Sequence, residues 1–233
     1  MKEPKIIQKR IGYSNATLLV NGSNSIIVDT AVRGHLRQFK RMFGQAGLKP
    51  EDVKLIILTH THNDHTGNLL PLVKLTGAKV MVHHNEFDNL KNGFTPIPTG
   101  QGFYTRIVTR LGKWMMPKFA SPKSFTADII NKDEFSLADY GIEAKVISTP
   151  GHSAGSQSVL IGNQLISGDV FINLRNGVIF PHFAENPELL IRTWNRLYEM
   201  GIEIIYPGHG PRMNVEKTKP AFEHWKKKLG LKI

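Results

Sequence analysis

Cysteine is absent from the 233 residues of the chain. This absence excludes disulfide bonds, thiolate nucleophiles and sulfur ligands, so a metal ion would have to be held by nitrogen and oxygen atoms. Acidic residues are also few, because 19 Asp and Glu stand against 30 Lys and Arg and the formal net charge is +11. Such an excess attracts anionic substrates or nucleic acid. The basic residues are nevertheless spread along the sequence, which also suits an ordinary solvated surface.

Long apolar runs are missing as well. No segment approaches the roughly 18 consecutive apolar residues of a membrane-spanning helix, and the first residues, MKEPKIIQKR, have no apolar stretch behind their charges. We therefore expect no transmembrane segment and a cytoplasmic protein. Hydrophobic residues make up 40% of the chain, which is enough for one well-filled core, so residues 1–233 are predicted to form a single domain.

Short apolar runs bounded by turn residues predict most of the regular structure. Strands are expected over residues 5–11, 16–20, 25–28, 53–58, 79–82, 143–148, 165–167 and 202–206, and helices over 35–43 and 67–75. Several of these strands run directly into loops that carry histidine or aspartate. Side chains at such strand ends project from rigid backbone into a shared crevice rather than into the core.

Histidine is concentrated after the strand predicted at residues 53–58. His60, His62, Asp64 and His65 fall within six residues there. A single histidine is usually a surface or packing residue, but no structural requirement explains this density. The alternation of His60 and His62 lets both face one metal ion, while Asp64 and His65 on the adjacent turn can face a second. His152, Asp169 and His209 each follow a strand-like run at a glycine-containing turn, where the backbone can bend closely around an ion.

Four motifs occur in a fixed order: His-x-His-x-Asp-His at 60–65, Thr-Pro-Gly-His-Ser-Ala-Gly-Ser at 149–156, Ser-Gly-Asp at 167–169 and Pro-Gly-His-Gly at 207–210. In this order and spacing they resemble the metallo-β-lactamase superfamily over residues 25–211. The resemblance implies an α/β fold of the αββα sandwich type, in which two β-sheets lie face to face with helices outside. It also implies a metal site along one edge of the sheets.

The resemblance further implies a division of the ligands between two ions. His60, His62 and His152 would hold the first, Asp64, His65 and His209 the second, and Asp169 would bridge them. We expect two divalent cations, with zinc as the first choice and iron or manganese as alternatives that suit the same ligands. Two such ions activate a water molecule at neutral pH. Asp64 is the predicted catalytic residue, which would orient this water and handle its proton.

For four further residues the sequence does not predict metal binding, and two of them have two possible roles. Asp29 stands where members of the superfamily carry an acid near the site, so it is either a partner of a ligand histidine or a turn residue that ends a strand. His83, His84 and His182 lie outside the motifs and are expected on the surface or in packing. His182 follows a strand-like run at 178–180 and has pocket lining as an alternative role.

The compact length and the motifs look closest to glyoxalase II-like and lactonase-like hydrolases. We therefore expect a metal-dependent hydrolase that cleaves an ester, thioester or lactone bond of a small anionic substrate. Three alternatives stay open: a nuclease or phosphodiesterase acting on RNA or nucleotides, an amide hydrolase of the β-lactamase type, and a metal-binding protein with a silent site. The absence of cysteine excludes the β-lactamases that use a Cys ligand. The oligomeric state is left open.

Residues 85–133 show no clear strand character and are predicted to be an insertion that covers the site. An apolar stripe at helical spacing and a basic face predict an amphipathic helix within it. The stripe comprises Phe103, Ile107, Leu111, Trp114 and Met115, and the basic face comprises Arg106, Arg110 and Lys113. This helix is either a cap that selects the substrate, a helix packed on the sandwich, or a helix that lies on a membrane surface.

Overall fold

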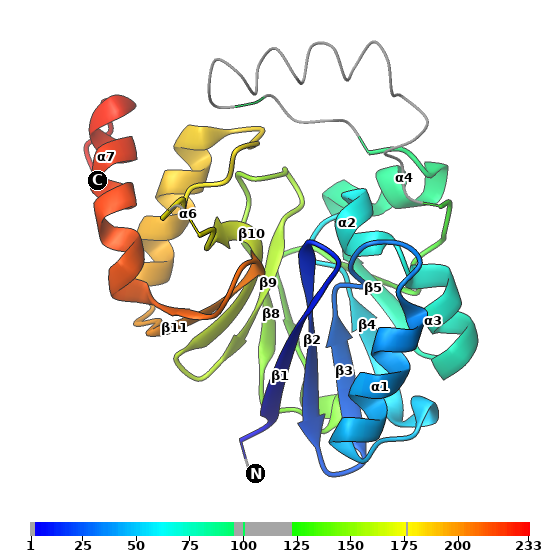
Figure 1. The fold of residues 1–233 in the computed structure, drawn as a ribbon. Coiled ribbons are helices and arrows are strands. Elements are labelled where there is room, and N and C mark those ends of the chain that lie inside the picture. Colours follow the sequence, from blue (N-terminus) through cyan, green and yellow to red (C-terminus); the bar gives the residue numbers. More distant parts are fainter. Residues whose placement is uncertain (1–2, 96–99, 101–122, 176) are drawn as a thin grey trace.

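Two six-stranded β-sheets pack face to face, and helices cover their outer faces (Figure 1). The computed structural model describes residues 3–95, 100, 123–175 and 177–233. The predicted αββα layering is confirmed. None of the described helices is long and apolar enough to cross a membrane.

The first sheet has the order β1-β2-β3-β4-β5-β6. Its strands are β1 (Lys5–Ile11), β2 (Ser14–Asn21), β3 (Asn24–Val28), β4 (Val53–Ile57), β5 (Lys79–His83) and β6 (Ile129–Asn131). Strand β2 pairs antiparallel with both β1 and β3. Strands β3, β4, β5 and β6 pair in parallel, each with the next. The associated helices are α1 (Leu36–Ala46), α2 (Asn63–Thr66), α3 (Leu69–Thr76) and α4 (His84–Asn92).

The second sheet has the order β12-β11-β10-β9-β8-β7. Its strands are β7 (Glu134–Ser136), β8 (Lys145–Ser148), β9 (Gln157–Ile161), β10 (Gln164–Ile172), β11 (Ile204–His209) and β12 (Met213–Asn214). Helices α6 (Pro187–Glu199) and α7 (Lys219–Lys228) lie on its outer side (Figure 1). Short 3-10 turns occupy Pro50–Asp52, Ala138–Tyr140 and Val215–Thr218.

Apolar side chains fill three layers of this sandwich. One cluster lies between the sheets, where Leu55 and Ile57 of the first pack with Val159 and Ile161 of the second. A second cluster packs the first sheet against its helices, and a third packs the second sheet against α6 and α7. Trp194 is fully buried in the third cluster. This burial on both sides of each sheet fixes the strand ends, where the candidate ligands stand.

Helix α6 was not expected from the sequence, although its start carries standard signals. The Asn186 side chain accepts a hydrogen bond from the Leu189 amide at 2.9 Å, and proline occupies the first helical position. Strand β9 was also missed, because all five of its residues are buried and it shows no alternation of polar and apolar side chains.

Two strands extend further than expected. Strand β10 continues to Ile172 and β11 to His209, so Asp169 and His209 lie within strands rather than in loops behind them. Register shifts in the β10–β11 pairing on both sides of Gly168 accommodate this irregular stretch. The strand-like run at 178–180 is not a strand.

The range 85–133 was predicted to lack strands, which is wrong at its C-terminal end. Strand β6 pairs in parallel with β5, and helix α4 occupies the beginning of the range. Both ends therefore belong to the first layer of the sandwich. The predicted amphipathic helix that contains Trp114 and Met115 lies outside the described residues, and its role as a cap stays a prediction.

Candidate metal centre

Two buried carboxylates hold the loop that follows β4. Asp29, directly after β3, accepts hydrogen bonds from the Thr59 amide and from Thr59 Oγ1, both at 2.8 Å. Glu86 of α4 accepts a hydrogen bond from Thr61 Oγ1. Because Thr59 and Thr61 flank His60, the loop has little freedom to move its histidines.

Three imidazole nitrogens converge in a first group. His60 Nε2 lies 2.9 Å from His62 Nδ1, and His152 Nε2 lies 3.2 Å from His60 Nε2 and 3.1 Å from His62 Nδ1. Tetrahedral zinc with bonds of about 2.0–2.1 Å would separate its nitrogen ligands by about 3.3 Å. The spacing of the three atoms is therefore close to that of three ligands around one ion.

A second group lies beside the first. His209 Nε2 is 3.3 Å from Asp64 Oδ2, and His65 Nε2 is 3.9 Å from the same oxygen. One donor atom from each of these three residues lies within 4.8 Å of the others. The carboxylate and the two imidazoles come from α2 and β11, so the two sheets meet at this group.

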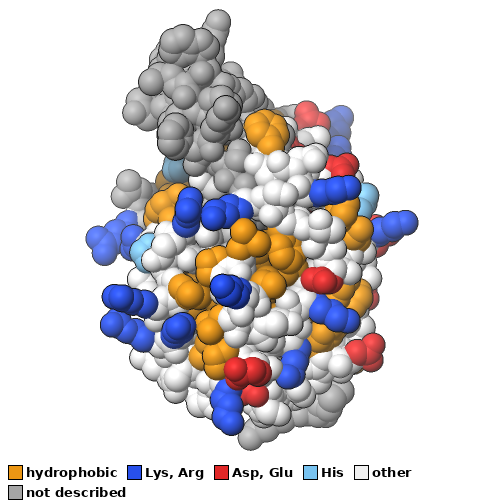
Figure 2. Space-filling view, turned by 90° about the vertical axis from the view of Figure 1, so that its right-hand side faces the viewer, with side chains coloured by type: hydrophobic (Ala, Val, Ile, Leu, Met, Phe, Trp, Pro, Cys, Tyr) orange, Lys and Arg blue, Asp and Glu red, His pale blue; other side chains and the backbone are white. Residues whose placement is uncertain are grey.

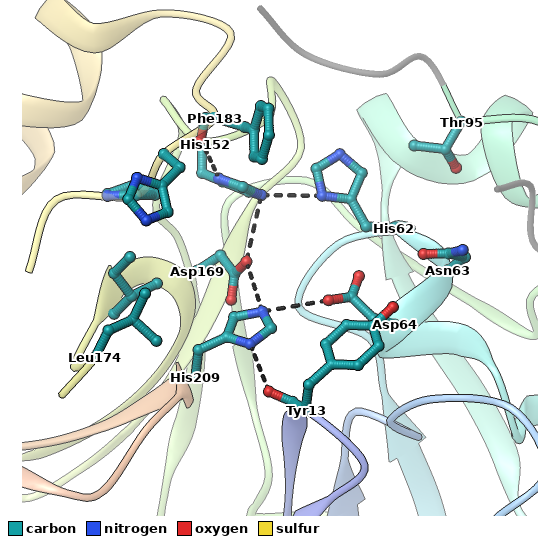
Figure 3. A pocket seen from close by; sticks show the side chains of 13 residues that line it. Tyr13, His62, Asn63, Asp64, Thr95, His152, Asp169, Leu174, Phe183 and His209 are labelled. Carbon is teal, nitrogen blue, oxygen red and sulfur yellow. Dashed lines mark hydrogen bonds and ion pairs between the residues drawn. The ribbon is translucent and has the colours of Figure 1, made fainter. Parts of the chain in front are cut away.

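Asp169 faces both groups (Figure 3). Its Oδ1 lies 3.3 Å from His65 Nε2, and its Oδ2 lies 3.3 Å from His209 Nε2 and 3.8 Å from His152 Nε2. All seven residues that the sequence predicted as metal ligands are thus brought together. A carboxylate in this position can bridge two cations.

Hydrogen bonds on the far side of the rings set their orientation. His65 Nδ1 donates to Asp29 Oδ2 at 2.8 Å. His152 Nδ1 donates to the Phe183 carbonyl and His209 Nδ1 to the Tyr13 carbonyl, both at 2.9 Å. A neutral ring that donates from Nδ1 carries its lone pair on Nε2. In the neutral form of each ring, which is the form that binds a metal, Nε2 therefore presents a lone pair to the centre.

Some buried polar atoms at the centre make no hydrogen bond of normal geometry within the described part of the chain, although two of them, His65 Nε2 and Asp169 Oδ1, lie 3.3 Å apart. They are His65 Nε2, Asp169 Oδ1 and His62 Nε2. A buried polar atom without a partner destabilises a fold. Coordination to a cation would satisfy the first two atoms, and the donor set consists wholly of the nitrogen and oxygen atoms that divalent metals accept. The residues therefore fit a pair of divalent metal ions.

The protonation states differ between the two groups. Burial lowers the pKa of His60 well below its usual value, and burial lowers that of His152 to about 3. Burial also opposes the charge on His209, but Asp169 and Asp64 outweigh it and raise the pKa to about 10. The pKa of His65 is raised well above its usual value because Asp169, Asp29 and Asp64 outweigh burial. The first group is therefore neutral at pH 7, whereas the second holds protons when no metal is bound.

The pKa values of the two carboxylates at the centre are lowered. Burial would raise the pKa of Asp64, but His65 and His209 outweigh it and bring the pKa to about 2. The pKa of Asp169 lies well below its usual value, because His209 and His65 outweigh its burial. Both side chains are anionic at neutral pH, which suits them to cations.

A cavity of about 400 Å³ opens onto the centre (Figure 3). Five of the ligand residues line it, together with Tyr13, Asn63, Thr95, Ile172, Leu174, Pro181, His182 and Phe183. His182 thus takes the pocket-lining alternative, whereas His83 accepts a hydrogen bond from the Asn85 amide at the start of α4. His83 and His84 lie against each other and not among the lining residues.

Sequence reasoning missed Glu86, Tyr13 and Phe183. Glu86 was an unremarked acid inside the presumed insertion, and the structure shows that it is buried and accepts a hydrogen bond from Thr61 Oγ1. Tyr13 and Phe183 act through backbone carbonyls, which no residue type reveals.

A model of the metallo-β-lactamase superfamily matches residues 10–209. The chain belongs to this superfamily. A probable metallo-hydrolase from Methanocaldococcus jannaschii is 29% identical over 206 residues, which are 85% of this chain and 89% of that protein. A hydroxyacylglutathione hydrolase from Shewanella pealeana is 28% identical over 130 residues, which are 56% of this chain but only 37% of that enzyme. The predicted metallo-hydrolase is confirmed at this level.

Solved structures support the fold. A metallo-β-lactamase family protein from Thermus thermophilus superposes with a TM-score of 0.71 at 22% identity, covering 97% of this chain and 80% of that one. A protein solved in a di-iron-bound form gives 0.66 at 23% identity, covering 92% and 96%. A class B3 di-zinc metallo-β-lactamase from an Alaskan soil metagenome gives 0.67 at 18% identity, covering 98% and 89%. Among these structures of similar fold, one thus holds two iron ions and another two zinc ions.

Proposed function

We propose that the chain is a dinuclear metallo-hydrolase that cleaves an ester, thioester or lactone bond of a small substrate. The observation that carries this proposal is the position of Asp169, which faces two separate groups of ligand atoms at the cavity. One group is made of three neutral imidazoles, and the other combines a carboxylate with two imidazoles. Such a pair of sites suits two ions a few ångströms apart.

The residues that would hold the first ion are His60, His62 and His152, and Asp64, His65 and His209 would hold the second, with Asp169 shared. Bound there, two divalent ions would lower the pKa of a water molecule toward neutrality and polarise the oxygen of the scissile group. Zinc is the first choice. Iron and manganese accept the same ligands, and both di-zinc and di-iron forms occur among the structures of similar fold.

Asp64 is the residue proposed to act on the nucleophile. Its carboxylate lines the cavity, and its pKa of about 2 keeps it anionic, because His65 and His209 outweigh its burial. An anionic oxygen beside the reacting water can accept a hydrogen bond from it and orient its lone pair toward the substrate. The same oxygen then holds the proton only briefly, since it is a weak base.

The cavity favours an acyl group as the reacting part of the substrate. Ile172, Leu174, Pro181 and Phe183 provide apolar walls, and neither Lys nor Arg is among its lining residues in the described part of the chain. An apolar cavity with a few polar groups is typical of small-molecule sites. The similarity of 130 residues to a protein named hydroxyacylglutathione hydrolase agrees with a thioester.

A nuclease is the second candidate, and the net charge of +11 is what favours it. On the face that Figure 2 shows, which carries α1 and α3, Lys and Arg side chains are scattered instead of forming one track. The cavity at the metal centre has no Lys or Arg among its described lining residues. A polynucleotide needs a continuous basic path for its phosphates. We therefore rank this function below acyl hydrolysis.

A substrate panel with zinc-reconstituted protein tests the choice. Thioesters, esters and lactones should be turned over faster than β-lactams or bis-p-nitrophenyl phosphate, and turnover should depend only weakly on salt. Tight binding of RNA that weakens steeply with salt, together with metal-dependent cleavage, would favour the nuclease instead.

A further inference from the structure

A second hollow of about 920 Å³ continues from the cavity at the metal centre. The two share Tyr13, Leu174 and His209, which Figure 3 shows along the lower side of the cavity. The second hollow lies where β1 and β2 of the first sheet meet β11 of the second. We call it the arginine groove, after the residues described next.

Three arginines line this groove: Arg10, Arg175 and Arg212. They come from β1, from the segment after β10 and from the turn after β11, so three separate parts of the chain place a guanidinium at one hollow. No acidic residue is among the described residues that line it. Arg10 Nε donates to the Gly12 carbonyl at 3.0 Å, and none of the three has an ion pair within the described part of the chain.

Two amide side chains, one half-buried and one buried, fix the floor of the groove. Gln8 Nε2 donates to the Pro207 carbonyl at 3.0 Å, and Asn15 Nδ2 donates to the carbonyls of Pro207 at 2.8 Å and Gly210 at 2.7 Å. These bonds tie β1 and β2 to the end of β11 across the two sheets. Arg10 and Arg212 therefore sit on backbone that is held at a constant spacing.

The distribution of charge between the two hollows is uneven. The cavity at the metal centre is walled by apolar side chains and has neither Lys nor Arg among its described lining residues, whereas the adjoining groove has three arginines and no carboxylate among its described lining residues. Guanidinium groups bind carboxylates and phosphates through paired hydrogen bonds. A ligand with an apolar part and an anionic part would therefore place the apolar part in the cavity and the anionic part in the groove.

We propose that the arginine groove binds the anionic tail of the substrate while its acyl bond lies at the metal centre. This inference rests on the proposed acyl hydrolysis. It names the substrate class as small acyl compounds, thioesters above all, whose leaving group carries several carboxylates or phosphates. The groove is wide enough for such a leaving group, because ligand pockets for small molecules measure about 300–1,000 Å³.

Three thioesters with the same acetyl group separate the possible anions. S-Acetyl-N-acetylcysteamine has no charge, S-acetylglutathione carries carboxylates, and acetyl-coenzyme A carries phosphates. The test variant is R10Q/R175Q/R212Q. The matched control is R37Q/K40Q/R41Q, which removes three positive charges from exposed positions of α1, on the face seen in Figure 2.

The groove variant should lose at least about tenfold in kcat/KM for the anionic thioester that fits, mostly through KM. Its kcat/KM for the uncharged thioester should stay within about twofold of the parent, and the control variant should keep its preference for the anion. The comparison of the two anionic substrates identifies carboxylate or phosphate as the ligand. An equal loss for charged and uncharged thioesters, or an equal effect of the control, would overturn the proposal.

A binding measurement keeps the groove separate from the reaction. S-Methylglutathione and S-methyl-coenzyme A are thioethers that cannot be hydrolysed, and calorimetry should show that one of them binds the parent protein at least about tenfold more tightly than the groove variant. If one thioether binds in this way but no thioester, ester or lactone is turned over, acyl hydrolysis is contradicted while the proposed role of the groove remains. Equal binding to both proteins would refute the groove. Tighter, arginine-dependent binding of a single-stranded RNA would replace the small molecule by nucleic acid.

Discussion

Asp29 Oδ2 accepts a hydrogen bond of 2.8 Å from His65 Nδ1, and both side chains are buried. The same carboxylate also accepts from Thr59, the residue before the first candidate ligand. Asp29 adopts a left-handed backbone conformation with φ of 63°. One acid thus orients a ring of the second ligand group and anchors the loop that supplies the first.

The first prediction concerns Asp29→Asn. Asparagine tolerates the left-handed conformation and can still accept from the Thr59 amide. Its Nδ2 would face His65 Nδ1, and two donors cannot bond each other, so the ring loses its fixed orientation. We expect metal affinity at the second group to fall by roughly 10- to 100-fold, measured by competition with a chromophoric chelator. Asp139→Asn, at an exposed position, is the control. Unchanged affinity in D29N would mean that Asp29 is only a turn residue.

Asp29 also illustrates how far the sequence reaches. The density of histidine and aspartate at 60–65 marks the ligand loop, because those residue types have no other reason to cluster. The contact between Asp29 and His65 was one of two open interpretations, since a strand end alone does not say where its side chain points.

Contacts across the sandwich could not be predicted in this way. The His209 ring is held by the Tyr13 carbonyl, and that pair is 196 positions apart in sequence. Which carbonyl meets which ring depends on how the two sheets pack. Strand β10 was expected to stop at Ser167, because the glycine at position 168 indicates a turn. Gly168 does adopt a left-handed conformation, but the strand continues past it through an irregular pairing.

The second prediction concerns the shared carboxylate. Asp169→Asn keeps the shape of the side chain but removes the charge that two cations would share. Elemental analysis of protein purified without chelators should fall from about two metal ions per chain to one or fewer, and turnover should drop by at least about 100-fold. A variant that keeps full activity with no bound metal would contradict the proposed mechanism.

The third prediction is the pH dependence of metal binding. In the metal-free protein the pKa of His209 is raised to about 10, because Asp169 and Asp64 outweigh its burial, and that of His65 is raised as well. Between pH 6 and 7.5 both hold a proton that a metal must displace, and each displaced proton weakens binding by roughly tenfold per unit of falling pH. The second group should therefore show a slope near two.

The first group should respond differently. Burial lowers the pKa of His60 and brings that of His152 to about 3, so these rings carry no proton to displace in the same window. Calorimetric titration of two metal equivalents at several pH values resolves the two events. If metal affinity changed equally with pH at both groups, the two groups would not differ in protonation as described.

The fourth prediction concerns Glu86, which is buried and accepts from Thr61 Oγ1. Glu86→Ala leaves that hydroxyl without its acceptor and opens space beneath the loop that carries His60 and His62. We expect weaker metal binding at the first group and a lower melting temperature, with partial recovery in Glu86→Gln, whose amide oxygen can still accept. The exposed Glu223→Gln on α7 is the control for loss of a negative charge. Normal metal content in Glu86→Ala would assign Glu86 a packing role alone.

The fifth prediction compares two glycines with nearly the same φ angle. Gly168 has φ of 52° and Gly162 has φ of 53°, so alanine is strained at either position. A Cβ on Gly162 would meet nothing within 4 Å, whereas one on Gly168 would overlap the Thr59 side chain. Gly162→Ala should therefore cost about 1–2 kcal/mol of unfolding free energy from the conformation alone.

Gly168→Ala should cost about 3 kcal/mol or more, because the overlap adds to the same strain. Thr59 can yield only by disturbing its bonds to Asp29, which also orients His65, and Asp169 is the next residue in the chain. The variant should therefore lose metal affinity together with stability, whereas Gly162→Ala should keep its metal. Urea unfolding and chelator competition on both variants measure the two quantities. Equal losses of stability would show that the backbone conformation, rather than the close approach of Thr59, is what requires glycine beside Asp169.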